Sequence, residues 1–321
     1  MTRRDVLWRL AQVVPTCAGI LVVGFLLVHA APGDPVLALA GDGGDAAYYA
    51  RIREQFGLDE PLLRQLGTYA GNAVRGDLGT SYTRGLPALE VLWGVLPATL
   101  LLTTSALVVS TLLGTVLGVV AAARPHGARD ALIGASSLGL YATPAFLAGQ
   151  LAILVFALRL GWFPVQGMTT ARSDATGWAR TLDIAHHLVL PVLVLAAQEV
   201  AAVARLTRAG LLEELGRDHI TTARAKGASE ARILVRHALR RALLPVVTVV
   251  GGRVGHLVAG TIIVEAVFSW PGVGGLLVSS VQARDTPIVL GLFLLISLTV
   301  VLANLLTDLT YAWLDPRVRY R

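Results

Sequence analysis

Long apolar windows alternate with short charged segments along most of the chain. Two windows hold one charge each, Glu199 within Leu188–Ala204 and Arg253 within Ala242–Val264. Each charge costs about 3 kcal/mol at a helix centre, which the flanking aliphatic residues offset. Four other windows are free of charge and reach the roughly 20 residues that cross a ~30 Å hydrocarbon core: Leu10–His29, Val91–Ala123, Ala131–Leu158 and Thr286–Thr307. The pattern predicts an all-α polytopic membrane protein with six transmembrane helices.

Composition supports a membrane protein and narrows its chemistry. Of the 321 residues, 55% are hydrophobic and 15% are charged, which is too apolar for a soluble domain of this length. The single cysteine, Cys17, lies in the first window and excludes a disulfide framework or a CxxC metal site. The first window is longer than the core of a signal peptide, so we expect an uncleaved helix.

The arginines of the short segments set the predicted orientation. They fall at residues 3, 4 and 9, at 124 and 129, and at 317, 319 and 321, which places both termini in the cytoplasm by the positive-inside rule. The net charge of +6 therefore needs no nucleic-acid partner. The predicted organisation is a cytoplasmic N-terminus and first helix (1–30), an extracytoplasmic segment (31–94), a core of helices 2–6 (95–314) with a cytoplasmic loop at 205–242, and a cytoplasmic tail (315–321).

Smaller signals refine this arrangement. Helical spacing of apolar residues between positions 45 and 74 predicts two short amphipathic helices in the extracytoplasmic segment. Leu-Pro pairs at Pro97, Pro191 and Pro245 predict helix starts, since proline costs nothing in a first turn. Ser110, Gly114 and Gly118 form a ridge of small residues that favours close packing inside the bundle.

The stretch from Thr221 to Pro245 is far more cationic than its surroundings, with six Lys or Arg and one acid. Asp218 is placed to cap a helix that runs through Lys226, and Gly227 to end it in the left-handed conformation. Ser229 is then placed to cap a second helix from Glu230 to about Leu243. In that helix, basic and apolar residues occupy opposite sides, which is typical of a membrane-interface helix: Arg232, Arg236 and Arg240 on one side, and Leu234, Val235, Ala238, Leu239 and Ala242 on the other.

The first helix of this stretch differs in character. Its small residues Thr222, Ala223 and Ala225 flank the long donors Arg224 and Lys226, and such a face suits a groove on another protein. A loop that binds anionic lipid is the alternative, at about 1 kcal/mol per basic residue. The lipid alternative leaves the glycine elbow unexplained, but the residues alone support both readings equally.

Sequence motifs identify a family resemblance at this point. "TARAKG" followed by "RHALRRALLPVVT" resembles the EAA loop of ABC importer permeases, in the form found in the dipeptide, oligopeptide and nickel transporter family. Thr221, Thr222 and Ala223 stand where the wider superfamily has Glu-Ala-Ala. The chain is similar to the B-type permease of that family through further motifs: "APGDP" (31–35), "FGLDEPL" (56–62), "RGDLGTSY" (75–82), "LGWFPVQGM" (160–168), "EAVFSWPGVG" (265–274) and "LTDLTYAWLDPRVR" (306–319).

The resemblance implies a multi-pass subunit of the bacterial cytoplasmic membrane that moves peptides. Its implied partners are a second, C-type permease, two cytoplasmic ATPase subunits and an external binding protein. Loop 205–242 would couple to the ATPases through Thr222, Ala223, Arg224, Ala225, Lys226, Gly227 and Ser229. The only lysine, Lys226, precedes glycine, so the chain has no Walker loop. We therefore expect no catalytic site, metal or cofactor in this chain, with ATP and Mg²⁺ held by the partner ATPases.

Other function classes have weaker support. An ion-gradient transporter would use membrane-embedded carboxylates, and Glu199, Arg253 and Asp308 are the charged residues in or beside the apolar windows. We expect Glu199 and Arg253 to form a structural ion pair. A hydrolase lacks any HExxH or GxSxG motif, and His186 with His187 is expected at the membrane interface. Among cargoes, peptides come first, while nickel chelates, opines and haem-like ligands stay open.

Overall fold

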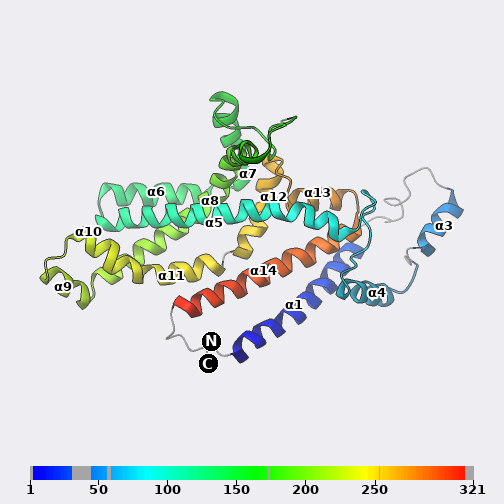
Figure 1. Ribbon diagram of the computed structural model, residues 1–321, viewed down its shortest axis with the longest axis horizontal. Helices are drawn as coiled ribbons and strands as arrows, with labels where there is room; N and C mark the ends of the chain where they lie inside the picture. Colours follow the sequence, from blue (N-terminus) through cyan, green and yellow to red (C-terminus); the bar gives the residue numbers. More distant parts are fainter. Residues whose placement is uncertain (1–2, 31–44, 56–58, 173, 253, 315–321) are drawn as a thin grey trace. The chain divides into compact units, whose positions relative to one another are not determined.

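The fold is helical throughout the part of the chain that the computed structural model describes, residues 3–30, 45–55, 59–172, 174–252 and 254–314. Strand structure in these ranges amounts to one isolated antiparallel bridge between Thr80 and Pro87. Lipid offers the backbone no hydrogen-bond partner, and helices satisfy their own. The predicted all-α class is confirmed. Figure 1 labels the helices, whose bounds are α1 (Arg3–Ala30), α3 (Ala46–Gln55), α4 (Leu62–Val74), α5 (Ala88–Ala123), α6 (Ala128–Ala142), α7 (Ala145–Ala152), η1 (Ile153–Arg159), α8 (Gly177–Leu215), α9 (Asp218–Ala225), α10 (Glu230–Arg232), η2 (Ile233–Ala238), α11 (Leu239–Gly252), α12 (Val254–Phe268), α13 (Val273–Gln282) and α14 (Thr286–Leu314).

Four described helices are long and apolar enough to cross a membrane: α1, α5, α8 and α14. Two bent pairs meet the same criterion when each is taken together, α6 with α7–η1, and the last part of α12 with α13. Counting each pair as one span gives up to six. The predicted fifth window is covered by α11 and α12, on either side of Arg253, which lies outside the described residues.

The third predicted window is a broken helix. α6 ends at Ala142 and α7 begins at Ala145, and the two axes differ in direction by 103°. Pro144 has no amide hydrogen and disfavours helical geometry in the residue before it. Thr143 is accordingly extended, with φ −80° and ψ 122°.

The expectation that Leu-Pro pairs begin helices was wrong. Pro97, Pro191 and Pro245 lie inside α5, α8 and α11, several residues beyond each start. In a membrane bundle, neighbouring helices and local adjustments satisfy the backbone groups that an internal proline frees. The proline signal alone therefore did not locate the helix ends.

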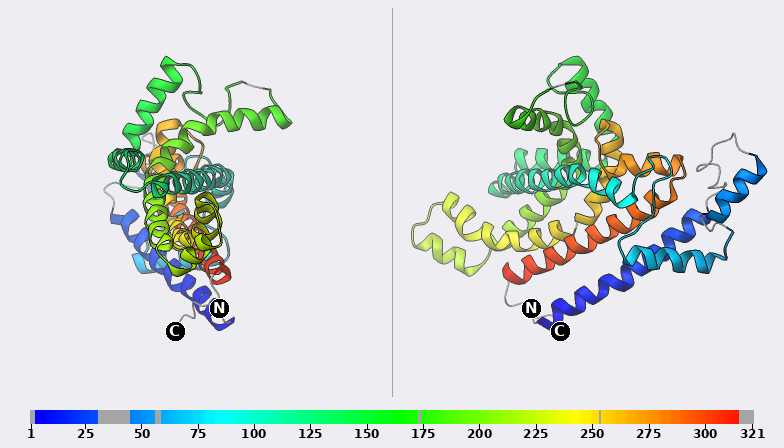
Figure 2. Two further views of the ribbon diagram at one scale, coloured as in Figure 1. Left: turned by 90° about the vertical axis from the view of Figure 1, so that its left-hand side faces the viewer. Right: turned by 45° about the vertical axis from the view of Figure 1, so that its right-hand side comes forward.

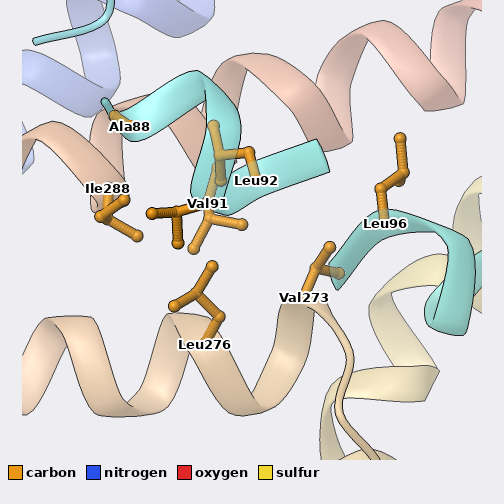
Figure 3. Close-up of a cluster of buried hydrophobic side chains, with 8 residues drawn as sticks. Ala88, Val91, Leu92, Leu96, Val273, Leu276 and Ile288 are labelled. Carbon is orange, nitrogen blue, oxygen red and sulfur yellow. The ribbon is translucent and has the colours of Figure 1, made fainter. Parts of the chain in front are cut away.

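The chain forms two compact units. Residues 2–99 and 271–302 make one of them, and its apolar core joins α5, α13 and α14 (Figure 3). α13 is a short apolar helix that follows the turn at residues 269–272. The core residues are Ala88, Val91, Leu92, Leu96, Val273, Leu276, Ile288 and Leu292.

Residues 100–270 and 303–321 make the other unit. Its longest helix, α8, packs against α6, α7, α11 and α12. The ridge of small residues on α5 also lies against α8, because a Cβ added to Gly114 would come within 2.6 Å of Val203, and one added to Gly118 within 2.6 Å of Thr207. Figure 2 shows the segment that precedes α8 and the helices that follow it at opposite ends of α8.

Candidate functional site

The cationic stretch forms two helical segments joined by a glycine elbow. Gly227 has φ +79°, the left-handed geometry that was expected, and a Cβ there would meet no atom within 4 Å. The Gly227 amide donates to the Arg224 carbonyl at 2.9 Å, and the Ala228 amide to the Ala223 carbonyl at 3.2 Å. These two bonds form a Schellman motif, which ends α9. Backbone conformation, and not lack of space, is therefore what requires glycine here.

The two helix starts differ from the sequence prediction. Arg217, and not Asp218, is the cap residue of α9, and Asp218 is the first helical residue. Ser229 does occupy the cap position of α10, but its side chain makes no capping hydrogen bond. The Ser229 carbonyl instead accepts from the Ile233 amide at 2.9 Å. An acidic residue in a first turn still complements the helix dipole without acting as the cap.

The elbow is anchored by a buried apolar cluster. Ile220 of α9 and Ile233 of η2 are both completely buried. They pack with the ends of α5 and α8 through Ala122 and Leu211, and with α11 through Ala242. Burying side chains of this size contributes about 1.5–3 kcal/mol each. α9 is therefore fixed to the ends of two membrane helices.

The second helix is longer than predicted and changes its winding. α10, the π-helical segment η2 and α11 follow one another without a break to Gly252, past the predicted end at Leu243. Because a π turn holds more residues than an α turn, it rotates the faces that come before and after it. Val235, which was expected to anchor the helix, is 59% exposed, and Ile233 and Ala238 are the buried anchors. Arg232, Arg236 and Arg240 are all exposed.

Most of the predicted coupling residues lie on the exposed surface of α9 and the elbow: Thr222, Arg224, Ala225, Lys226, Gly227 and Ser229, with Ala223 half-buried. Arg224 is not a free donor. Its Nε lies 2.8 Å from Glu230 Oε1, and its Nη2 lies 3.2 Å from Glu230 Oε2. This hydrogen-bonded pair raises the pKa of Arg224 and lowers that of Glu230. The long donor left open on this surface is Lys226.

Charged side chains of α8 and a basic side chain of α11 contact the start of α9. Arg217 Nε lies 2.9 Å from Glu214 Oε1, and Arg217 Nη2 lies 2.8 Å from Glu213 Oε1. The hydrogen bond to Glu213 is the main cause of the raised pKa of Arg217. Arg241 Nη1 donates to His219 Nδ1 at 3.4 Å. Contacts from both α8 and α11 therefore hold the start of α9.

The predicted intramembrane charges are only partly described. Glu199 is buried in α8. Arg253 lies outside the described residues, as does the side chain of Asp308, whose backbone belongs to α14. The Glu199–Arg253 pair stays a prediction.

Sequence reasoning missed an ion pair that joins two helices of this unit. Arg208 of α8 holds Asp130 of α6 with two bonds of 2.6 Å, from Nε to Oδ1 and from Nη2 to Oδ2. Asp130 Oδ2 also accepts from the backbone amide of His126 at 2.9 Å. The two partners are 78 residues apart, so no local pattern could have revealed the pair.

A second missed feature lies in the other unit. Asp285 is completely buried and accepts hydrogen bonds from the hydroxyls of Ser81 and Thr83 and from the amides of Tyr82 and Thr83. Burial and the Asp285 charge together raise the pKa of Tyr82 to about 12. We call this set of hydrogen bonds the Asp285 clasp. Ser81, Tyr82 and Thr83 fall in and beside the "RGDLGTSY" motif, which was the only indication of the clasp in the sequence.

The histidine pair lies inside α8, and both rings bond to backbone carbonyls. His186 Nε2 bonds to the Trp162 carbonyl at 2.8 Å, and His187 Nδ1 to the Asp183 carbonyl at 2.9 Å. Over the part of the chain that the structure describes, no group of three or more His, Cys, Asp or Glu side chains is arranged to hold a metal ion.

Comparison with known proteins matches this arrangement to one family. The family model described as "Binding-protein-dependent transport system inner membrane component" matches residues 114–320. That range includes α8, the elbow and the cluster that anchors it.

Relatives match over nearly the whole chain. The chain is 40% identical to "Glutathione transport system permease protein GsiC" of Escherichia coli (strain K12) over 316 residues, 98% of this chain and 99% of the relative. It is 38% identical to "Oligopeptide transport system permease protein AppB" of Bacillus subtilis (strain 168) over 308 residues, 96% of each. The likeness therefore includes the segment before residue 114.

A solved structure supports the fold. A chain of the structure titled "Inward facing conformations of the MetNI methionine ABC transporter: CY5 SeMet soak crystal form" matches with a TM-score of 0.55. The match covers 70% of this chain and 97% of the other at 17% identity. At that identity the likeness concerns the fold alone.

Proposed function

Because the chain belongs to the family of inner membrane components of binding-protein-dependent transport systems, we propose that α9 and its elbow are the surface through which cytoplasmic ATPases drive it. The protein is a multi-pass permease subunit of an ABC importer. Without a Walker loop of its own, it must receive the work of ATP hydrolysis from partner subunits that bind ATP and Mg²⁺.

One observation carries the proposal: α9 has small exposed residues, and Ile220 on the same helix is completely buried in the protein. Ala225 and Lys226 are exposed, while Ile220 on the same helix is completely buried against α5 and α8. A partner that presses on α9 therefore moves the membrane helices with it. A ligand shifts a conformational equilibrium only through a contact that differs between the two states.

The cargo proposed is a short peptide or a peptide-like thiol. The support is that two relatives carry oligopeptide and glutathione transport in their names, at 38% and 40% identity. The proposed assembly has a second permease of the C type, two ATPase subunits and an external binding protein. An ion-gradient transporter is the weaker candidate, since its support was the charged residues Glu199, Arg253 and Asp308, whereas family membership supports the importer.

A test uses cross-linking in the assembled complex. Ala225→Cys in a Cys17→Ala chain should form a disulfide with cysteines placed along the groove of the ATPase, and Arg232→Cys should not. Uptake of a radiolabelled tripeptide should stop when the Walker lysine of the ATPase is replaced. Uptake that continues without ATP hydrolysis would instead favour the ion-gradient transporter.

A further inference from the structure

The break between α6 and α7 interrupts a helix pair that is either one broken span or a re-entrant loop. The Thr143 carbonyl, at the break, accepts a hydrogen bond from Gln198 Nε2 of α8 at 3.2 Å. Non-helical backbone at membrane depth occurs where it is buried in protein or lines a water-filled cavity. The break therefore marks a place where the span faces protein or water.

An exposed arginine reaches toward this break from α8. The Arg205 guanidinium lies 5.5 Å from the centre of the Tyr141 ring, a cation–π contact. Tyr141 is only two residues before Thr143, and its side chain is 52% exposed. Arg205 is exposed as well and lies two helical turns from Gln198, on the same face of α8.

The direction of the Arg205 side chain is the informative feature. α6 and α8 are antiparallel, since Arg208 meets Asp130 near the start of α6 and Gln198 meets Thr143 just past its end. The backbone of Arg205 therefore lies near the level of the Asp130 pair. Side chains on a helix lean toward its N-terminus, which for α8 is the direction of the break, and the Arg205 guanidinium accordingly reaches the Tyr141 ring.

Long basic side chains in lipid normally extend toward the nearest water. Within the described residues no carboxylate pairs with Arg205, so a protein counter-charge does not explain its direction. The Tyr141 ring holds the guanidinium, and its charge is open to an anion that reaches the break.

We propose that Arg205, stacked on Tyr141 beside the break, is a cationic site on the translocation pathway that receives a carboxylate of the cargo. The proposal rests on the proposed function, because peptides and peptide-like thiols carry carboxylates. The guanidinium offers paired donors in the geometry that a carboxylate accepts. Gln198 keeps the broken segment in place, and Tyr141 fixes the guanidinium without neutralising its charge.

The experiment measures access and charge preference at this site without any assumed cargo. Leu138 is three residues before Tyr141 and is 61% exposed, and Cys17 is the only native cysteine. In Cys17→Ala/Leu138→Cys chains assembled with their partners in vesicles, modification rates are measured for an anionic methanethiosulfonate (2-sulfonatoethyl) and a cationic one (2-trimethylammonioethyl). ATP-dependent uptake by the Cys17→Ala complex is recorded separately, so failure of the proposed function shows up on its own.

We expect both reagents to react, with the anionic one favoured. Arg205→Gln should lower the anionic-to-cationic rate ratio severalfold, because the guanidinium attracts the anionic reagent and repels the cationic one. Arg205→Lys should restore most of the ratio, while the exposed control Arg232→Gln should leave it unchanged. Tyr141→Phe keeps the ring and should preserve the ratio.

Two outcomes overturn the proposal. A cysteine at position 138 that reacts with neither reagent in the native complex, yet reacts after denaturation, places this face against lipid or protein. A rate ratio that is the same in Arg205→Gln and in the parent chain shows that the guanidinium does not act on anions in the pathway.

Discussion

Arg224 and Glu230 face each other across the Gly227 elbow, joined by bonds of 2.8 and 3.2 Å. The pair connects the end of α9, the proposed docking helix, to the start of α10. Both side chains are exposed, and exposed pairs contribute little to stability. The pair therefore does little to hold the elbow folded, and we predict that it orients the elbow instead.

The first prediction concerns this pair. Glu230→Gln should leave abundance unchanged and cause only a small loss of bound ATPase on purification, whereas Arg224→Glu should lose more because two acids then face each other. Arg224→Glu with Glu230→Arg should recover most of the loss. If the double variant binds ATPase no better than Arg224→Glu alone, Arg224 contacts the ATPase directly and the pair has no orienting role.

The Arg224–Glu230 pair also predicts how retention of the ATPase depends on pH. Arg224 lowers the pKa of Glu230, so the contribution of the pair is complete above the ordinary glutamate pKa and is lost as the pH falls through the lowered value. The ratio of ATPase retention between wild type and Glu230→Gln should thus stay constant from about pH 8 to 6. A ratio that changes in that range would assign the dependence to another group.

The second prediction tests the elbow with a matched glycine. Gly227→Val places a β-branched side chain at φ +79° and should cost at least about 1–2 kcal/mol of local stability. Gly216 ends α8 in right-handed geometry with φ −83°, so Gly216→Val should be far milder. Gly227→Val should insert normally but retain little ATPase and show little uptake. The opposite result would be full uptake by Gly227→Val and loss of uptake when Arg232, Arg236 and Arg240 are all replaced. That result would indicate a lipid-binding loop.

The third prediction concerns the orientation of the protein in the membrane. In a Cys17→Ala chain, a cysteine at Thr80 should react with an impermeant maleimide from outside, and one at Ser229 only from the cytoplasm. Both positions are exposed, so neither result depends on unfolding. The opposite pattern would invert the topology that the arginines indicate.

The fourth prediction concerns the intramembrane charges. If Glu199 holds Arg253, then Arg253→Ala or Glu199→Arg alone should lower assembly and transport, and Glu199→Arg with Arg253→Glu should restore them. Abundance in the membrane and tripeptide uptake are the measurements. Normal function of Arg253→Ala alone would show that the pair has no role.

The fifth prediction addresses the Asp285 clasp. Asp285→Ala leaves buried donors on Ser81, Tyr82 and Thr83 without an acceptor and should cost on the order of 3 kcal/mol or more. Trypsin cleavage after Arg84, followed by mass spectrometry, should become much faster. Asp77→Ala, which removes only an exposed bond to the Gly79 amide, is the control and should change cleavage little.

The sequence predicted one local feature of the site correctly. Glycine at position 227 indicated a left-handed end, and the structure has that geometry. The apolar windows predicted helices because length and composition alone decide whether a segment can cross a bilayer.

Features that depend on distant partners could not be predicted. Pro144 breaks its helix while Pro97 does not, although both follow residues of ordinary helical windows. The difference lies partly in Gln198, which satisfies the Thr143 carbonyl from another helix. The π segment is equally hidden, because periodicity assumes a constant number of residues per turn, and Val235 was therefore assigned to the wrong side.

The Asp285 clasp also has a consequence for biogenesis. Ser81 and its acceptor are 204 residues apart, so the ribosome must add nearly two thirds of the chain after Ser81 before the bond can form. At about 5–20 residues per second that interval is roughly 10–40 s. Until then the hydroxyls and amides of residues 81–83 have no carboxylate to bind. Closure of this loop is thus a late event of membrane insertion, and a nascent chain stalled before Asp285 should show the outer segment in a protease-sensitive form.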